Sequence, residues 1–265
     1  MIPQFYTSRP EWPERIEALV EQVGRVGAFE ERSGQALELR RANRVGSVHS
    51  STAIEGNRLS LAQVEAVADG LPVRAAPREV LEVENALAAY EALADLDPWN
   101  VADLLRAHRL LTVGLQPEAG EFRTVEVEIV NAEGGVIHTG SRAEKVPRLM
   151  AELLEWGGSS GDHPVVVSSA VHFLIEHIHP FRDGNGRVGR LWQTLILSHW
   201  RPLFAWMPTE TLIRRNQAAY YLALQASREP EIDAAHFIDF MLRVIAESLA
   251  EYEAQLRAPI AGEPA

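Results

Sequence analysis

Apolar residues recur at intervals of three and four along most of this chain, which is the spacing of one face of an α-helix. Residues that can cap a helix stand in front of several of these periodic segments. Ser60 with Gln63, and Ser141 with Glu144, fit capping boxes, and Asn100 can cap a further helix. The pattern predicts a mainly α-helical fold, with helices over residues 12–30, 36–55, 60–69, 78–96, 100–113, 142–156, 164–178, 187–199, 209–227 and 232–257.

One segment, residues 124–140, interrupts the helical pattern. Apolar and polar residues alternate on both sides of a Gly-rich centre at residues 131–135, and Val125, Val127 and Ile129 fall on one face. This alternation predicts a β-hairpin with a loop longer than two residues. Two interpretations stay open, because such a hairpin is either a decoration or an exposed edge that captures an extended strand of a partner.

Composition limits the class of protein. Apolar residues make up 46% of the 265 residues and charged residues 23%, so the chain can build a core. The net charge of −12 argues against a broad surface for nucleic acids, and the absence of cysteine excludes disulfides and thiolate metal sites. We find neither a secretory signal nor an apolar run of about 18 residues that would span a membrane. We therefore expect a soluble cytoplasmic protein.

Residues 179–190, His-Pro-Phe-Arg-Asp-Gly-Asn-Gly-Arg-Val-Gly-Arg, combine a turn with several reactive side chains. Pro180 ends the preceding helix, and the turn Gly184-Asn185-Gly186 can point backbone N–H groups inward as an anion nest. A new helix follows, and its N-terminus favours an anion too. Arg187 and Arg190 are three residues apart and therefore share one helix face.

Two further side chains in this segment suit phosphate chemistry. Asp183 offers a carboxylate for Mg²⁺ shared with a phosphate, and His179 titrates near neutral pH and can deprotonate a hydroxyl. An anion cradle, a ligand for a hard metal, two cations and a base together indicate phosphoryl or nucleotidyl transfer.

The same segment resembles the Fic motif, His-x-Phe-x-Asp/Glu-Gly-Asn-Gly-Arg-x-x-Arg, and matches it at every specified position. The resemblance implies a Fic-type helical bundle with one β-hairpin flap and a catalytic core at residues 100–245. Residues 1–99 then form a helical region in front of the core, and residues 246–265 form the end of a helix and a tail. Gly140 departs from the many relatives that have proline after the flap.

The resemblance also implies roles for single residues. His179 is the general base, Asp183 binds Mg²⁺, and Phe181 anchors the loop. Gly184, Asn185 and Gly186 hold the ATP phosphates together with Arg187 and Arg190, and Arg190 reaches the γ-phosphate. Tyr220 or Tyr221 borders the adenine, and Val136, Ile137 and His138 belong to the flap that holds the target. The implied activity is the transfer of AMP from ATP to a hydroxyl of a target protein, with release of pyrophosphate.

Upstream, Ser51-Thr52-Ala53-Ile54-Glu55-Gly56 resembles the inhibitory motif Ser/Thr-x-x-x-Glu-Gly/Asn of Fic proteins. The resemblance implies that Ser51, Glu55 and Gly56 belong to an inhibitory helix in the same chain. Glu55 would pair with Arg190 and compete with the γ-phosphate for that cation.

Other hypotheses remain beside this one. The same pocket can serve the removal of AMP from a modified protein, with Glu55 positioning water, and a Fic fold can act as a non-enzymatic regulator that binds ATP or a partner. A zinc site at His172, Glu176, His177 and His179 is disfavoured by spacing. Trp192, Trp200 and Trp206 are expected in the core or between helices. The expected partners are ATP and an unidentified target protein, with homo-oligomer formation left open.

Overall fold

Two antiparallel helices at the centre of the molecule, α7 (Pro164–Ile178) and α8 (Asn185–Trp200), position the motif segment between them. The computed structural model describes residues 5–130 and 135–258. α7 is apolar on nearly all sides and is buried almost throughout, as expected for a helix enclosed by others. It starts at Pro164, with the His163 side chain as cap, and ends at His179.

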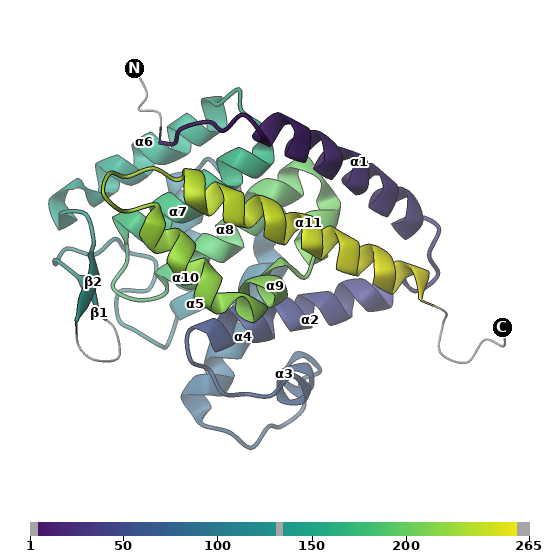
Figure 1. The fold of residues 1–265 in the computed structure, drawn as a ribbon. Coiled ribbons are helices and arrows are strands. Elements are labelled where there is room, and N and C mark those ends of the chain that lie inside the picture. Colours follow the sequence, from purple (N-terminus) through teal and green to yellow (C-terminus); the bar gives the residue numbers. More distant parts are fainter. Residues whose placement is uncertain (1–4, 131–134, 259–265) are drawn as a thin grey trace.

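Long helices surround this pair (Figure 1). α1 (Trp12–Glu30) packs along α11 (Ala235–Arg257), and α11 also lies across α7. α2 (Ala36–Ile54) packs on α9 (Thr209–Arg215) and α4 (Pro77–Glu91). Both α1 and α11 bury an apolar stripe and expose a polar face, so each closes one side of the core.

Shorter elements complete the bundle. α3 (Leu61–Ala68) projects at the bottom of Figure 1 and begins with the predicted capping box of Ser60 and Gln63. α5 (Val101–Thr112) begins with the predicted cap Asn100, whose side chain accepts from Ala102 N–H at 2.8 Å. The remaining helices are α6 (Val146–Ser159), α10 (Gln217–Ala226) and the 3₁₀ turns η1 (Ala92–Asp95), η2 (Ala143–Lys145) and η3 (Pro202–Trp206).

The predicted hairpin is confirmed. β1 (Glu128–Val130) and β2 (Val136–Thr139) pair antiparallel, with Ile129 opposite His138 and with an irregular register between Ile129 and Val130. The strands are shorter than the alternation predicted, and residues 131–134 of the predicted turn lie outside the described part of the chain. Within the residues described, this is the only sheet beside eleven α-helices, which confirms the mainly α class.

Two local predictions are wrong. Ser141 and Glu144 form no capping box, because η2 precedes α6 and the Glu126 carboxylate accepts from Ala143 N–H at 3.1 Å instead. The helix predicted over residues 209–227 is interrupted at Asn216. The Asn216 side chain donates to the Leu212 carbonyl at 3.0 Å, a local bond that competes with the regular helix.

The three tryptophans lie where they were expected. Trp192 is fully buried and donates to the Pro98 carbonyl at 3.1 Å, while Trp200 and Trp206 pack against the rim of the core. Within the described part of the chain, no helix has both the length and the apolarity needed to cross a membrane.

Candidate active site

The loop between α7 and α8 starts at His179, which has a left-handed backbone with φ of 55°. This conformation is costly for a residue other than glycine and is typical of positions that the surrounding structure holds in place. The His179 ring lines a pocket in front of the loop. Burial lowers the pKa of His179 to about 4, so its imidazole is neutral at pH 7.

Asn185 and His108 fix the path of the loop. The Asn185 side chain accepts from the Phe181 N–H at 2.9 Å and donates to the Phe181 carbonyl at 2.8 Å. The buried Phe181 ring stacks on His108 with 3.7 Å between ring centroids, as the anchoring role required. His108 accepts from Gly120 N–H at Nδ1, so Nε2 carries the proton and donates to the Asp183 carbonyl at 2.9 Å.

The N-terminus of α8 lies at the pocket. Gly184 has φ of 85°, which favours glycine, and Gly184, Asn185 and Gly186 all line the pocket. A Cβ at Gly186 would come within 2.4 Å of the Glu55 carboxylate. The helix N-terminus, which attracts anions, is therefore next to a carboxylate from α2.

Arg190 is held by the predicted inhibitory segment. Its side chain is 1% exposed, and its Nη2 lies 2.8 Å from Glu55 Oε1. Arg190 also donates from Nε to Ser51 Oγ and from Nη2 to the Ser51 carbonyl, each at 3.0 Å. Burial acts to lower the pKa of Arg190, but Glu55, Tyr220 and Glu176 together outweigh burial and raise it. Gly56, with φ of 96°, ends α2 directly behind Glu55.

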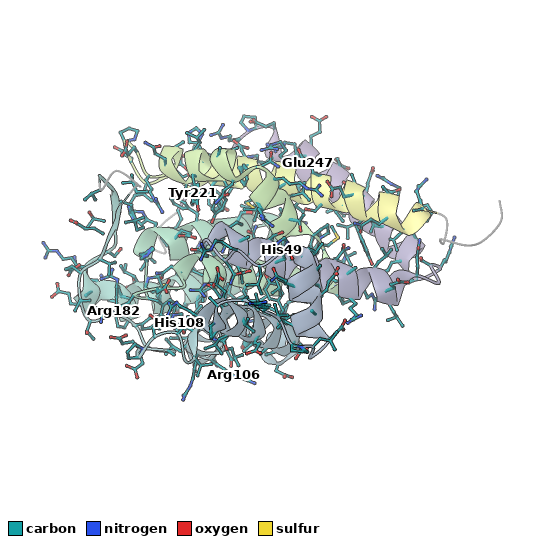
Figure 2. The ribbon with its side chains drawn as sticks, turned by 90° about the horizontal axis from the view of Figure 1, so that it is seen from below. His49, Arg106, His108, Arg182, Tyr221 and Glu247 are labelled. Carbon is teal, nitrogen blue, oxygen red and sulfur yellow. The ribbon has the colours of Figure 1, made fainter. Side chains whose placement is uncertain are left out.

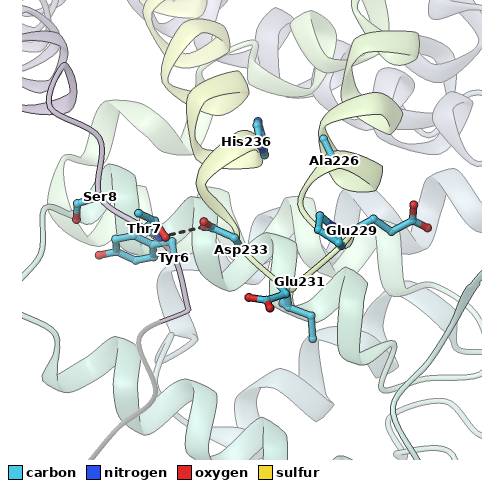
Figure 3. A pocket seen from close by; sticks show the side chains of 10 residues that line it. Tyr6, Thr7, Ser8, Ala226, Glu229, Glu231, Asp233 and His236 are labelled. Carbon is cyan, nitrogen blue, oxygen red and sulfur yellow. Dashed lines mark hydrogen bonds between the residues drawn. The ribbon is translucent and has the colours of Figure 1, made fainter.

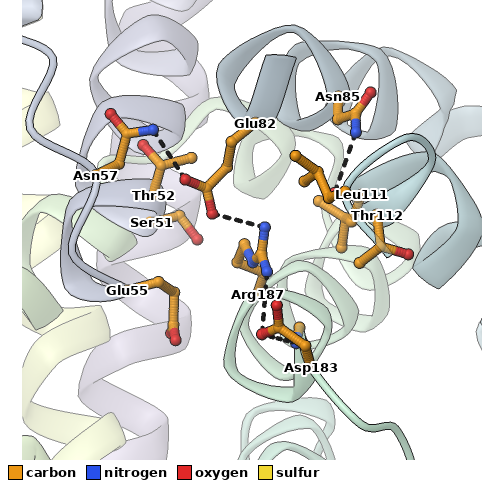
Figure 4. Close-up of polar contacts among 12 residues, drawn as sticks. Ser51, Thr52, Glu55, Asn57, Glu82, Asn85, Leu111, Thr112, Asp183 and Arg187 are labelled. Atoms are coloured by element: carbon orange, nitrogen blue, oxygen red, sulfur yellow. Dashed lines mark hydrogen bonds and ion pairs between the residues drawn. The ribbon is translucent and has the colours of Figure 1, made fainter. Parts of the chain in front are cut away.

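The partners of Arg187 differ from those of Arg190 (Figure 4). Its Nη1 lies 2.7 Å from Glu82 Oε1 on α4, and its Nη2 lies 3.4 Å from Asp183 Oδ1. The Arg187 side chain is 4% exposed and does not line the pocket. The two motif arginines therefore pair with different carboxylates of the N-terminal region, Arg187 with Glu82 and Arg190 with Glu55.

Arg123 joins the flap to the motif loop. This buried guanidinium donates to the carbonyls of Val125 and His179 at 2.7 Å each, and also to those of Ile178 and Ser141. These carbonyls belong to the chain before and after the hairpin and to the end of α7, where the helix dipole favours a cation. The sequence placed Arg123 in the core region but did not reveal this bridging role.

The pocket itself has a volume of about 210 Å³ and combines residues from the motif, the flap, α2, α7 and α10. Predicted members that line it are Glu55, Ile137, His179, Asp183, Gly184, Asn185, Gly186, Arg190, Tyr220 and Tyr221. The Tyr220 hydroxyl is buried beside the Glu176 carboxylate at 3.2 Å, whereas Tyr221 is 49% exposed. Figure 2 shows Tyr221, Arg182 and His108 at the same end of the molecule as the hairpin.

Sequence reasoning missed three charged residues of this pocket, Glu176, Arg182 and Arg228. Burial raises the pKa of Glu176, and the neighbouring Glu55 charge raises it further. Arg228 donates to the Glu176 carbonyl at 3.2 Å, and burial lowers its pKa. No spacing in the sequence connects Arg228, which follows α10, with the motif.

The residues of the disfavoured zinc site serve other contacts. His172 Nδ1 lies 2.6 Å from Gln193 Oε1 and its Nε2 lies 3.1 Å from the Tyr220 hydroxyl, so the ring joins α7 to α8 and α10. The His177 carbonyl accepts from the flap residue His138, with 2.7 Å to Nε2. Among the described residues, no group of three or more His, Asp or Glu is placed to hold a metal ion.

A larger hollow of about 460 Å³ lies elsewhere, between the N-terminal segment and the turn from α10 to α11 (Figure 3). Thr7 N–H donates to the Asp233 carboxylate across it at 3.0 Å. Its lining includes Glu229, Glu231 and His236 but no residue of the motif. The smaller pocket in front of His179 is therefore the candidate active site.

Comparison with known proteins agrees with this geometry. The sequence profile of the Fic/DOC family matches residues 98–197. The crystal structure of a Fic family protein from Desulfovibrio desulfuricans is 41% identical, covers 98% of this chain and 79% of its own, and superimposes with a TM-score of 0.86. This chain belongs to the Fic family. The Fic-type bundle with its hairpin flap is thereby confirmed.

Curated Fic relatives carry a named activity. Proteins named protein adenylyltransferase Fic from Drosophila melanogaster and Culex quinquefasciatus are 28% and 30% identical over 229 and 197 residues. These alignments cover 82% and 70% of this chain but 44% and 37% of the relatives. The chain thus spans less than half the length of the curated Fic proteins it matches.

Proposed function

We propose that this Fic protein transfers AMP from ATP to a hydroxyl side chain of a target protein. One observation carries the proposal. A single pocket combines a neutral histidine, a carboxylate, glycine N–H groups at a helix N-terminus and the buried Arg190. The activity in the names of the curated relatives, protein adenylyltransferase, is the chemistry that this combination suits.

In the proposed reaction, His179 accepts the proton of the target hydroxyl. The hydroxyl oxygen attacks the α-phosphorus, the bond to the bridging oxygen breaks, and pyrophosphate leaves. The Nδ1 atom of His179 is buried, so Nε2 is the ring nitrogen available to receive the proton. The N–H groups of Asn185 and Gly186 and the Arg190 guanidinium stabilise phosphate charge, while the Gly184 N–H donates to Asp183.

Asp183 suits Mg²⁺. Its side chain is 51% exposed, faces the pocket and uses one oxygen for Gly184 N–H and Arg187. One carboxylate together with nucleotide phosphates is a common way to hold this ion, which keeps several waters. When bound, Mg²⁺ would neutralise charge on the phosphates.

We further propose that Glu55 keeps the enzyme inhibited. The Glu55 carboxylate lies 2.8 Å from Arg190 Nη2 and next to Gly186, where the phosphate cradle is expected. A γ-phosphate directed to Arg190 would meet this carboxylate. ATP would then bind with its α-phosphorus misaligned, and misalignment is costly where positioning supplies much of the rate.

The flap would hold the target. Val136 and Ile137 are both 53% exposed, and Ile137 also lines the pocket. An extended target segment can add to the exposed edge of β2 by main-chain pairing. That placement would bring a side-chain hydroxyl of the target in front of His179.

The test is incubation of the protein and of its Glu55→Gly variant with Mg²⁺ and ATP labelled at the α-phosphate. Label on the protein itself or on lysate proteins supports transfer. Release of AMP only from targets that were modified beforehand would favour hydrolytic removal of AMP, in which Glu55 positions the attacking water. Binding of ATP without either reaction would favour a regulator without catalysis.

A further inference from the structure

Glu82 on α4 contacts the Fic motif from outside the pocket. Its Oε1 lies 2.7 Å from Arg187 Nη1, and its Oε2 accepts from the Asn57 side chain at 2.9 Å. Asn57 follows Glu55 and Gly56 at the end of α2, so Glu82 joins the inhibitory segment to the motif (Figure 4). Glu82 is 105 residues from Arg187 in sequence, and no spacing pattern announces the pair.

The two carboxylates of the N-terminal region differ in what they can obstruct. Glu55 lines the pocket, where it would meet a nucleotide phosphate. Glu82 and Arg187 do not line the pocket, and their side chains are 17% and 4% exposed. Glu82 is therefore placed to orient a motif side chain without displacing the nucleotide.

Arg187 is shared unequally between two carboxylates. The contact with Glu82 is short, at 2.7 Å, whereas the contact with Asp183 is long, at 3.4 Å. Within the described residues these are the two carboxylates that touch Arg187, and the Arg187 Nε has no partner there. A buried guanidinium that lost the Glu82 charge would be drawn to Asp183, the other carboxylate that it touches.

We propose that Glu82 is a positioning residue that limits Arg187 to a long contact with one oxygen of Asp183, at 3.4 Å, and so keeps the Asp183 carboxylate available for Mg²⁺. The inference rests on the proposed function, because it takes Asp183 as the ligand of that ion. It assigns Glu82 the opposite effect from Glu55. Loss of Glu55 frees a cation for phosphate, whereas loss of Glu82 lets a cation compete with the metal.

The test measures binding rather than turnover. The probe is α,β-methylene-ATP, which cannot release pyrophosphate by AMP transfer, and the readout is the shift in thermal unfolding temperature as Mg²⁺ is titrated. All variants carry Glu55→Gly, so that the nucleotide site is open. We expect Glu82→Gln to raise by about 10-fold the Mg²⁺ concentration that produces half of the thermal shift. Effects of this size are usual when a residue that positions a metal ligand is replaced.

Glu79 is the matched control. It lies one turn before Glu82 on α4 and pairs with Arg58, which is 85% exposed, rather than with the motif. Glu79→Gln should leave the Mg²⁺ requirement at the parent value. In EDTA, the shift produced by the analogue should be equal in the parent, Glu79→Gln and Glu82→Gln proteins.

Three results would overturn the proposal. They are equal Mg²⁺ requirements for Glu82→Gln and Glu79→Gln, an equal weakening by Glu82→Gln in EDTA, or tighter binding by Glu82→Gln. If Glu82→Gln does not fold, Glu82→Asp takes its place, because it keeps the charge on a shorter side chain. Its Mg²⁺ requirement should lie between the parent value and about 10 times that value. A requirement equal to the parent value would refute the proposal. A parent that binds the analogue with Mg²⁺ but transfers no AMP from ATP contradicts the proposed function alone.

Discussion

Glu55 Oε1 lies 2.8 Å from Arg190 Nη2 although the two residues are 135 positions apart in the chain. The contact joins the end of α2 to α8, the helix whose N-terminus faces the pocket. The Arg190 side chain is buried and the Glu55 side chain is one-third exposed, so the pair can open on the Glu55 side. This asymmetry makes Glu55 the partner to replace.

Glu55→Gly should raise incorporation of labelled AMP by about 10-fold or more, because Arg190 becomes free for the γ-phosphate and positioning improves. Adding Arg190→Ala should abolish the gain. Glu31→Gly is the matched control, since Glu31 also follows a helix and is exposed. Unchanged or lower incorporation by folded Glu55→Gly would refute autoinhibition.

His179→Ala should reduce AMP transfer by about 100-fold or more while nucleotide binding persists, because the variant loses the base and retains the phosphate cradle. Transfer is measured with labelled ATP and binding by titration calorimetry, both in the Glu55→Gly background. His199→Ala is the control, since His199 is exposed on the far part of α8. Transfer at the parent rate would contradict the role of His179.

Proline at Val136 and Ile137 should impair modification of a target more than binding of ATP, since proline removes the N–H that an added strand needs. Ile137 is the more telling position. The register places Ile129 opposite His138 and Val130 opposite Val136, so Ile137 is an extra residue without a partner in the hairpin. Equal losses of target modification and ATP binding in a folded Ile137→Pro protein would assign the hairpin a structural role.

Arg123→Lys should lower target modification by about 10-fold or more with a smaller effect on ATP binding, because an ammonium group cannot reach the carbonyls that the guanidinium fork serves. The kcat and KM for the target peptide would be measured in the Glu55→Gly background. Arg148→Lys is the control, as Arg148 is exposed and pairs only within α6. Equal kcat for both variants would show that the flap and the His179 backbone keep their positions without Arg123.

The free energy of unfolding should fall as the pH is lowered from about 6.5 toward 4. Burial lowers the pKa of His172 to about 3 from 6.5, so in this range the unfolded chain binds a proton that the folded chain excludes. A His172→Gln variant should lose about 1.4 kcal/mol per pH unit of that slope. Denaturant unfolding at several pH values would check it, and an unchanged slope would contradict the buried neutral state.

The sequence predicted elements whose causes are local. Helices with caps at Ser60 and Asn100, and the stop at Pro180, follow from residues within one or two turns. The Ser141 cap failed because the distant Glu126 carboxylate accepts from Ala143 N–H, and the Ser141 N–H donates to the Ile178 carbonyl. Local spacing does not encode a partner from another part of the chain.

The candidate site shows the same division. The motif alone predicted that His179, Asp183 and the glycines lie together, because all of them belong to one short segment of the chain. The contacts of Arg187 with Glu82 and of Arg123 with four carbonyls depend on how α4 and the flap pack, and no single segment contains that information. The glycine at 140 has a structural reason as well. Its N–H donates to the Val127 carbonyl at 3.1 Å, a bond that proline cannot make.

The proposed inhibition and the proposed catalysis both require that residue 186 has no side chain. A methyl group there would come within 2.4 Å of Glu55 and 3.0 Å of Arg190. Any side chain at 186 that evicted the Glu55 carboxylate would fill the same space that a phosphate needs. If Glu55 inhibits as proposed, a substitution at 186 would not relieve that inhibition without also narrowing the nucleotide site, whereas a substitution of Glu55 at the end of α2 would.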